Sequence, residues 1–186
     1  MNFTNIQVYN KDEKLSKSDI LEKLKAFNDS RNLASLDIKN ENKIDVKFDD
    51  MCSFFTCFDT GYKFKDLKNN KSYIRKLAKL FTLPVISVSY INDESIVIEQ
   101  YNFNKRIYDY IVISENFESL KKLGYERENV IYNEDIWNYF VGKNDISKIK
   151  EIIMEKSRYD DMKIMLIDIL KLYGIKEENI LYTGKE

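Results

Sequence analysis

The sequence predicts an α+β fold in which a largely antiparallel sheet carries helices and a helical C-terminal half packs on one of its faces. Three runs rich in β-branched and aromatic residues, 85–91, 96–101 and 107–113, are separated only by short polar turns. Such turns join antiparallel neighbours, so we expect a meander over 85–113. Beyond the meander the apolar residues recur at helical spacing. The length of 186 residues and the 44% share of apolar residues are consistent with one domain, 1–186, that has a well-buried core.

In the N-terminal half, strand and helix patterns alternate. A first strand is expected at 6–9, and Ser16 with Asp19 has the spacing of a capping box that opens the next helix. Apolar and charged residues alternate over 44–48, which predicts a half-buried strand. The uncharged aromatic run 53–58 predicts a more buried one.

A change of period marks the helix that precedes the meander. It is expected from Asn70 to just before Pro84, since a proline disfavours helical backbone in the residue before it. Its inner face consists of Ile74, Leu77, Ala78 and Phe81. Four further helices are expected at 117–123, 133–141, 145–153 and 162–173. The last of them has the widest apolar stripe and should lie deep in the core.

One phrase occurs twice in the C-terminal half. Residues 123–132 and 173–182 each place a glycine where a helix is expected to end. A left-handed glycine at this place lets the next apolar residue meet an apolar residue of the last helical turn. The two expected pairs are Tyr125 with Leu120 and Ile175 with Leu170. We interpret the repeat as a local helix stop, with a ligand-contact role for its Glu-Asn pairs as the less favoured alternative.

The chain contains no histidine, and this absence limits the chemistry that it can perform. Imidazole is the commonest general base near neutral pH and a frequent metal ligand, so Ser-His-Asp, Cys-His and histidine–zinc sites are excluded. Cys52 and Cys57 lie in an apolar run, where buried free thiols are expected rather than a disulfide or a zinc site. The five glycines form no phosphate-binding loop. We therefore expect no cofactor and no metal.

The charges of the chain almost balance. Lys plus Arg number 30 and Asp plus Glu 31, so the net charge of −1 provides no global field that would recruit nucleic acid or an anionic membrane. The first residues lack the basic and apolar regions of a secretory signal, and no run approaches the length of a membrane span. We expect a cytoplasmic protein that does not associate with membranes.

A magnesium-dependent nuclease is the enzymatic alternative. Asp45 and Lys47 alternate on an expected strand, with Asp37 or Asp59 nearby, and carboxylates with a lysine can hold Mg²⁺ and orient water. The same alternation is typical of a solvated strand face, and this spacing is common by chance in a chain that is 33% charged. An enzyme is therefore less favoured than a binding protein.

A basic stretch over 63–79 offers a second alternative, a nucleic-acid-binding module. It has seven basic residues against one acid, Asp66, and Tyr62, Phe64 and Tyr73 are interleaved. Cations mixed with aromatic rings are typical of grooves that bind single strands. The expected helix needs a polar face in any case, so a solvated face is the favoured interpretation. The basic residues are Lys63, Lys65, Lys68, Lys71, Arg75, Lys76 and Lys79.

The acidic segment 40–61 is the candidate contact surface. It has five acids against two lysines, and its phenylalanines could add an aromatic centre to a charged rim, which is the anatomy of a protein interface. Burial of these phenylalanines in the core is the competing interpretation. We add the tip of the first meander hairpin to this surface. The candidate partner-binding residues are Asp49, Asp50, Phe55, Asp59, Asp93 and Glu94.

Several segments resemble a loose group of small bacterial α/β proteins similar to the immunity proteins that are encoded beside polymorphic toxins. These segments are the strand 54–59, the helix end 77–81, the step 82–86, the hairpin through 92–94 and the closing helix 161–175. The sequence departs from the pattern at Phe54, where a tryptophan is expected, and at Asn104, where the second hairpin usually has glycine. The resemblance implies a non-enzymatic protein that blocks a cognate toxin, and it carries over no catalytic residue.

These observations favour a non-enzymatic protein-binding protein, with an immunity protein that occludes the surface of a toxin as its specific form. The expected partner is another protein, nucleic acid is a less favoured partner, and the oligomeric state stays open. Charge reversal at Asp49 and Asp50 is expected to weaken partner capture without lowering the melting temperature.

Overall fold

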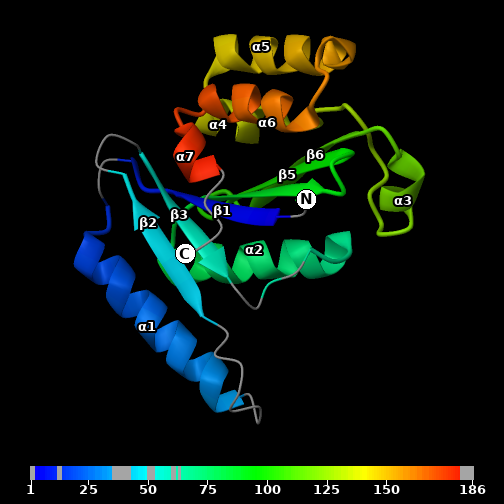
Figure 1. Ribbon diagram of the computed structural model, residues 1–186. Helices are drawn as coiled ribbons and strands as arrows, with labels where there is room; N and C mark the ends of the chain where they lie inside the picture. Colours follow the sequence, from blue (N-terminus) through cyan, green and yellow to red (C-terminus); the bar gives the residue numbers. More distant parts are fainter. Residues whose placement is uncertain are drawn as a thin grey trace.

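The computed structural model describes residues 3–11, 14–34, 43–49, 53–59, 62 and 64–180. In this part of the chain a six-stranded antiparallel sheet lies between two groups of helices, which confirms the expected α+β class (Figure 1). The strands are β1 (Phe3–Tyr9), β2 (Ile44–Phe48), β3 (Phe54–Asp59), β4 (Val85–Ile91), β5 (Ser95–Asn102) and β6 (Ile107–Ser114). The helices are α1 (Lys17–Ala34), α2 (Leu67–Phe81), α3 (Phe117–Lys121), α4 (Glu134–Phe140), α5 (Lys143–Met154), the 3-10 turn η2 (Lys156–Arg158), α6 (Met162–Lys171) and α7 (Glu177–Ile180).

The strand order is β2-β3-β1-β4-β5-β6, and every neighbouring pair is antiparallel. β4, β5 and β6 form the expected meander. In its first turn Asn92 and Asp93 adopt positive φ angles of 54° and 61°, which their short polar side chains tolerate. β1 is longer than the expected strand at 6–9 and lies inside the sheet, between β3 and β4.

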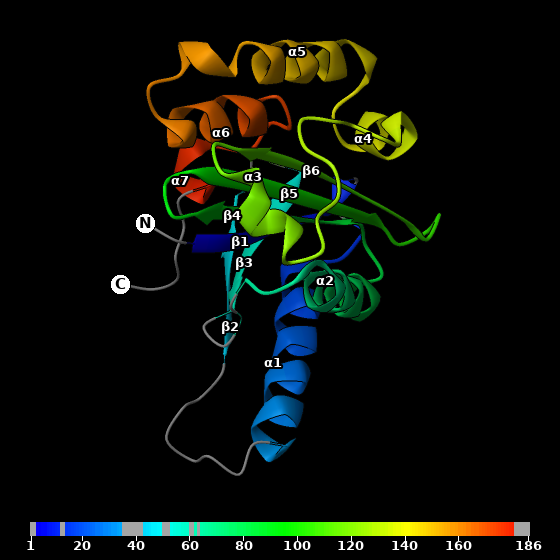
Figure 2. The same cartoon turned by 90° about the vertical axis from the view of Figure 1, so that its right-hand side faces the viewer.

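One face of the sheet is covered by the C-terminal helices α4, α6 and α7, and α5 packs on α4 and α6 as an outer layer (Figures 1 and 2). The expectation that the last long helix lies deep in the core is confirmed. Each fully buried aliphatic side chain of this kind contributes roughly 1.5–3 kcal/mol to folding. The buried residues of α6 are Met162, Met165, Leu166, Ile167, Ile169 and Leu170.

The opposite face carries α1, α2 and α3 (Figure 2). The inner side of α2 packs on β4 and β5 through the four apolar residues that its spacing predicted. α3 departs from the expectation that the C-terminal helices share one face, because it lies beside the start of α2. The backbone N–H of Leu67 donates to the carbonyl of Leu123 at 2.9 Å, and Tyr125 packs with Val97 and Val112 on this side of the sheet.

Both glycines of the repeated phrase stop a helix as predicted. Gly124 and Gly174 have φ angles of 91° and 75°, and the N–H groups of Tyr125 and Ile175 each donate to the carbonyl five residues earlier at 3.2 Å. The continuations differ, since only the second copy goes on into a helical turn, α7. The repeat is therefore explained by local structure.

A buried aspartate fixes the segment that connects α3 to α4. Asp109 of β6 is 1% exposed and accepts hydrogen bonds from the indole N–H of Trp137, from Arg127 and from the backbone N–H of Asn133, each at 2.9 Å. The guanidinium of Arg127 also lies over the ring of Tyr110, 4.3 Å from its centroid. This carboxylate pairs donors that would otherwise be unsatisfied in the interior.

Candidate functional site: the basic face of helix α2

The described residues of the predicted acidic surface are not brought together on one face. Asp49, which follows β2, is 7% exposed in its side chain and accepts from the ammonium of Lys176 at 3.0 Å and from Asn179 at 3.2 Å. It therefore holds α7 against the sheet. Asp50 lies outside the described residues.

Phe55 and Asp59 are interior residues, which corrects the expectation that they line a contact surface. Phe55 is 3% exposed and packs against Phe81 on the α2 side of the sheet, with ring centroids 5.2 Å apart. Asp59, on the same strand and the same face, is 5% exposed and accepts a hydrogen bond from the hydroxyl of Tyr73. Strand alternation sends both side chains inward.

Asp93 and Glu94 are exposed at the tip of the β4–β5 turn, but they are far from Asp49 along the strands. β2 ends where Phe55 pairs with the C-terminal part of β1, whereas β4 ends beside the N-terminal residue of β1. The five candidate residues that the structure describes are thus divided between two ends of the sheet and its interior.

Of the described residues of the nuclease alternative, Asp45 and Lys47 share one face of β2, and Asp59 does not join them. Asp45 lies 3.6 Å from the ammonium of Lys43, and the ammonium of Lys47 donates to the carbonyl of Glu178 at 3.3 Å on the α7 side of the sheet. Asp59 points to the opposite face, towards α2, and Asp37 lies outside the described residues. Within the described part of the chain no three Cys, Asp or Glu side chains converge to hold a metal ion.

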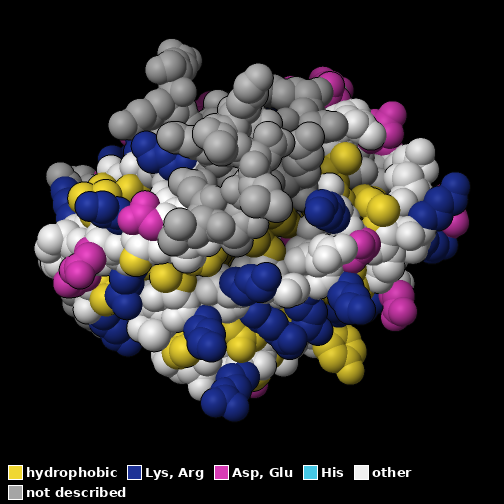
Figure 3. All heavy atoms as spheres, turned by 90° about the horizontal axis from the view of Figure 1, so that it is seen from below, with side chains coloured by type: hydrophobic (Ala, Val, Ile, Leu, Met, Phe, Trp, Pro, Cys, Tyr) yellow, Lys and Arg dark blue, Asp and Glu magenta, His cyan; other side chains and the backbone are white. Residues whose placement is uncertain are grey.

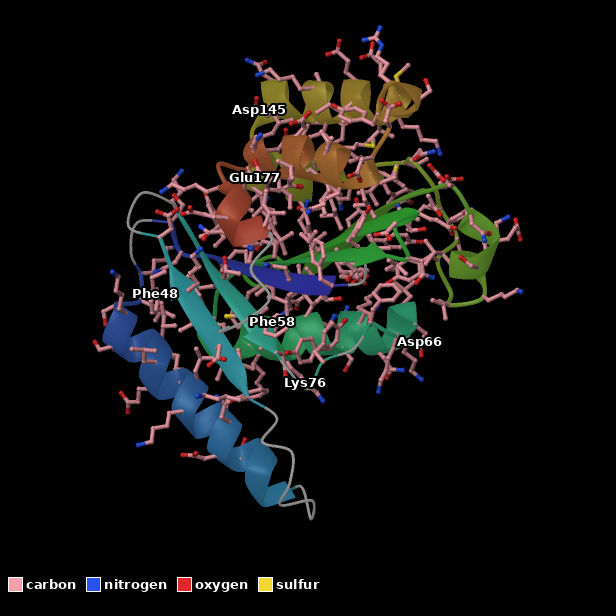
Figure 4. All side chains as sticks on the ribbon, viewed as in Figure 1. Phe48, Phe58, Asp66, Lys76, Asp145 and Glu177 are labelled. Atoms are coloured by element: carbon pink, nitrogen blue, oxygen red, sulfur yellow. The ribbon has the colours of Figure 1, made fainter. Side chains whose placement is uncertain are left out.

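The strongest surface feature is a row of cations on the outer side of α2. We call Lys68, Lys71, Arg75, Lys76 and Lys79 the α2 basic face. They recur at helical spacing, line a shallow hollow with Ser72, and gather on the face seen from below in Figure 3. Lys76 points away from the sheet (Figure 4). The other two basic residues of the predicted stretch do not belong to the row: Lys65 precedes the helix, and Lys63 lies outside the described residues.

Local interactions fix the orientation of this row. The carboxylate of Asp66 caps α2 by accepting from the N–H of Asn69 at 2.9 Å, and Thr82 ends the helix at a left-handed φ of 57°. The inner residues Ile74, Leu77 and Phe81 are fully buried. A helix held by its ends and its apolar side must present the remaining positions to solvent.

The α2 basic face carries charge that no acid of the described chain neutralises. None of its five cations forms an ion pair with a carboxylate among the residues that the structure describes. Lys71 and Arg75 instead lie over the rings of Tyr108 and Tyr101, 4.5 and 5.6 Å from the centroids. Partial burial, together with the charge of Arg75, lowers the pKa of Lys71.

The aromatic rings of the basic stretch stack on other rings of the protein. Tyr62 stacks on Tyr73 with centroids 4.2 Å apart, and Phe64 stacks on Tyr125 at 5.9 Å. The hydroxyl of Tyr62 donates to the side chain of Asn70 at 2.7 Å. These rings connect α2 to the sheet.

A buried acid lies behind the α2 basic face, and the sequence interpretation missed it. Glu99 of β5 is 0% exposed, and one of its oxygens accepts from the hydroxyls of Tyr108 at 2.6 Å and Tyr125 at 3.3 Å. Burial raises the pKa of Glu99 to about 7, although the two hydroxyl donors act in the opposite direction. The sequence did contain one indication of this buried acid, because Glu99 is the single charged residue of β5, a strand that has neighbours on both sides.

Comparisons with protein-family models, with curated proteins and with solved structures return no match for this chain. Among the described residues no helix has the length and apolar character needed to cross a membrane. The geometry of the chain is therefore the basis for assigning a function.

Proposed function

We propose that this chain is a binding protein that acts without catalysis and that it contacts an anionic macromolecule through the α2 basic face. The observation that carries this proposal is the row of five cations that lack a carboxylate partner among the described residues. Like charges on neighbouring helical turns repel one another, so an external anion stabilises the row.

The α2 basic face has the dimensions of a contact surface. From Lys68 to Lys79 the helix rises by about 16 Å at 1.5 Å per residue. Its cations attract an anionic surface across roughly one Debye length, about 8 Å at physiological salt. Such charges accelerate encounter more than they add to the final affinity, so binding should weaken as the salt concentration rises.

The specific form that we propose is an immunity protein, whose partner would be a toxin with an acidic surface. Occlusion needs complementary shape and charge and no reactive group, which agrees with a chain that lacks histidine. The proposed contact surface is basic because the acidic candidates are buried or scattered. A toxin gene beside the gene for this chain would support the immunity form, and its absence would remove that form.

A charge-reversal series tests the binding function. We expect the wild-type chain to bind dextran sulfate, used as a general polyanion, and the Lys71→Glu/Arg75→Glu variant to lose this binding. The matched control is Lys25→Glu/Lys122→Glu, which changes the same number of charges at exposed sites on α1 and after α3. Equal losses in the two variants would mean that net charge alone drives binding and would contradict a role for α2.

A further inference from the structure

We infer that the partner of the α2 basic face is an acidic surface of another protein, whose carboxylates dock against Lys71 and Arg75. This inference rests on the proposed binding function and names the class of its partner. It commits to a protein because the aromatic rings and amide side chains that would help to recognise a nucleic acid are engaged within the described part of the chain.

Among the described residues, the aromatic rings beside the row are already engaged and offer little surface for base stacking. The rings of Tyr62 and Phe64 are stacked on Tyr73 and Tyr125. Of the rings under the row, Tyr101 is 9% exposed and lies beneath the guanidinium of Arg75, and the ring of Tyr108 is covered by Lys71. Single-strand binding depends on aromatic faces on which successive bases stack, so this mode is disfavoured.

Base edges have few readers on α2. Asn70 is 0% exposed and its amide donates to the hydroxyl of Tyr125 at 2.9 Å, while the amide of Asn69 donates to Asp66 at 2.6 Å. The cations of the row can still contact guanine edges and phosphates, but both amide side chains of α2, which could read adenine, are engaged. The net charge of −1 gives phosphate contacts no long-range support.

The two central cations have the properties of interface anchors. Each is held over a tyrosine ring, so it loses less side-chain freedom on binding than a lysine that is free in solvent. Arginine and tyrosine are enriched among the residues that dominate protein interfaces. The half-buried Leu80 and Phe103 belong to the same apolar cluster as α2. Lys71 is half-buried, so a carboxylate that reaches its ammonium is partly shielded from solvent.

The row should consequently contain two kinds of cation. Lys71 and Arg75, held in place, should control dissociation, and the Lys71→Ala/Arg75→Ala variant should dissociate roughly tenfold faster or more. Lys68 and Lys76 are exposed and act through their charge, so Lys68→Ala/Lys76→Ala should mainly slow association. The two variants remove the same number of charges, which separates position from net charge.

The experiment measures binding of the full chain to poly-L-glutamate, to a DNA duplex and to a DNA single strand at two salt concentrations. We expect poly-L-glutamate to bind more tightly than either DNA at equal salt. Its binding should weaken in both variants, through faster dissociation in Lys71→Ala/Arg75→Ala and through slower association in Lys68→Ala/Lys76→Ala. Lys25→Ala/Lys122→Ala is the control. Far-UV circular dichroism and the fluorescence of Trp137 establish that each variant is folded.

Three outcomes would overturn the inference, and they point to different errors. Tighter binding of DNA that is lost in Lys71→Ala/Arg75→Ala would keep the binding function and replace the partner class. Self-association of the wild type that the same variant abolishes would identify a second copy as the occupant. If no polyanion bound in a manner that depends on α2, the proposed function itself would be wrong.

Discussion

The Glu99→Gln variant keeps the shape of a fully buried side chain and removes its ionisation. The neutral amide oxygen can still accept hydrogen bonds from Tyr108 and Tyr125, which bond to one carboxylate oxygen in the wild type. The variant therefore removes the negative charge beneath α2 and places an amide N–H where the second carboxylate oxygen has no hydrogen-bond partner, so the pH dependence of its stability reports the charge.

The magnitude follows from the pKa of Glu99, which burial raises from 4.5 to about 7. Below the lower value the carboxyl is protonated in both the folded and the unfolded chain. Between the two values only the unfolded chain releases the proton, so rising pH lowers the free energy of unfolding, and the loss is complete above about pH 7. At 1.36 kcal/mol per unit the total loss is about 3 kcal/mol.

Urea titrations followed by the fluorescence of Trp137, which is the single tryptophan and is fully buried, provide the assay. Relative to the wild type, Glu99→Gln should gain about 3 kcal/mol of stability between about pH 4.5 and pH 8. The exposed Glu151→Gln is the control and should follow the wild type. A difference between Glu99→Gln and the wild type that stays constant over this range would refute the reasoning.

Three further changes test other parts of the fold. Asp109→Ala leaves unpaired the buried donors that converge on this carboxylate, so it should lower the free energy of unfolding, measured in urea, by roughly 3–5 kcal/mol. The control Asp145→Ala removes a more exposed carboxylate and should change the free energy of unfolding by less than about 1 kcal/mol. Gly174→Ala places a side chain at a φ of 75° with nothing within 4 Å of the new Cβ, so backbone strain alone should lower the free energy of unfolding by about 1 kcal/mol. An unchanged melting temperature would contradict this. In a Cys52→Ser background Cys57 should resist a thiol reagent until the chain unfolds, because burial raises the pKa of its thiol. Rapid labelling of Cys57 in the native protein would contradict this and would reveal opening of β3.

Local patterns were sufficient to predict the elements but not their partners. The meander, the apolar side of α2 and the two glycine stops depend on spacing within a short stretch of chain, and all are confirmed. The insertion of β1 between β3 and β4 is a choice among distant strands, to which its alternation gives no clue. The position of α3 beside α2 is non-local for the same reason.

The candidate site shows a similar division. Acids that are close in sequence, such as Asp49 and Asp59, were grouped by their charge, but an intervening strand carries them to different ends of the sheet. The row on α2 was visible because a helix brings residues three and four apart onto one side. Its interpretation as solvated or nucleic-acid-binding depended on aromatic contacts that only the folded chain supplies.

Tyr108 of β6 connects the buried acid Glu99 to the α2 basic face. Tyr108 lies between them, because its hydroxyl donates to Glu99 and its ring lies 4.5 Å from the ammonium of Lys71. An ionised Glu99 repels an anionic partner on the α2 basic face, because little solvent separates the two negative charges. The partner should therefore bind more tightly when Glu99 is protonated. By linkage, the affinity for poly-L-glutamate should fall as the pH rises through about 7. Glu99→Gln should lose this pH dependence and keep the salt dependence, and a pH dependence that survives in the variant would place its origin in another group.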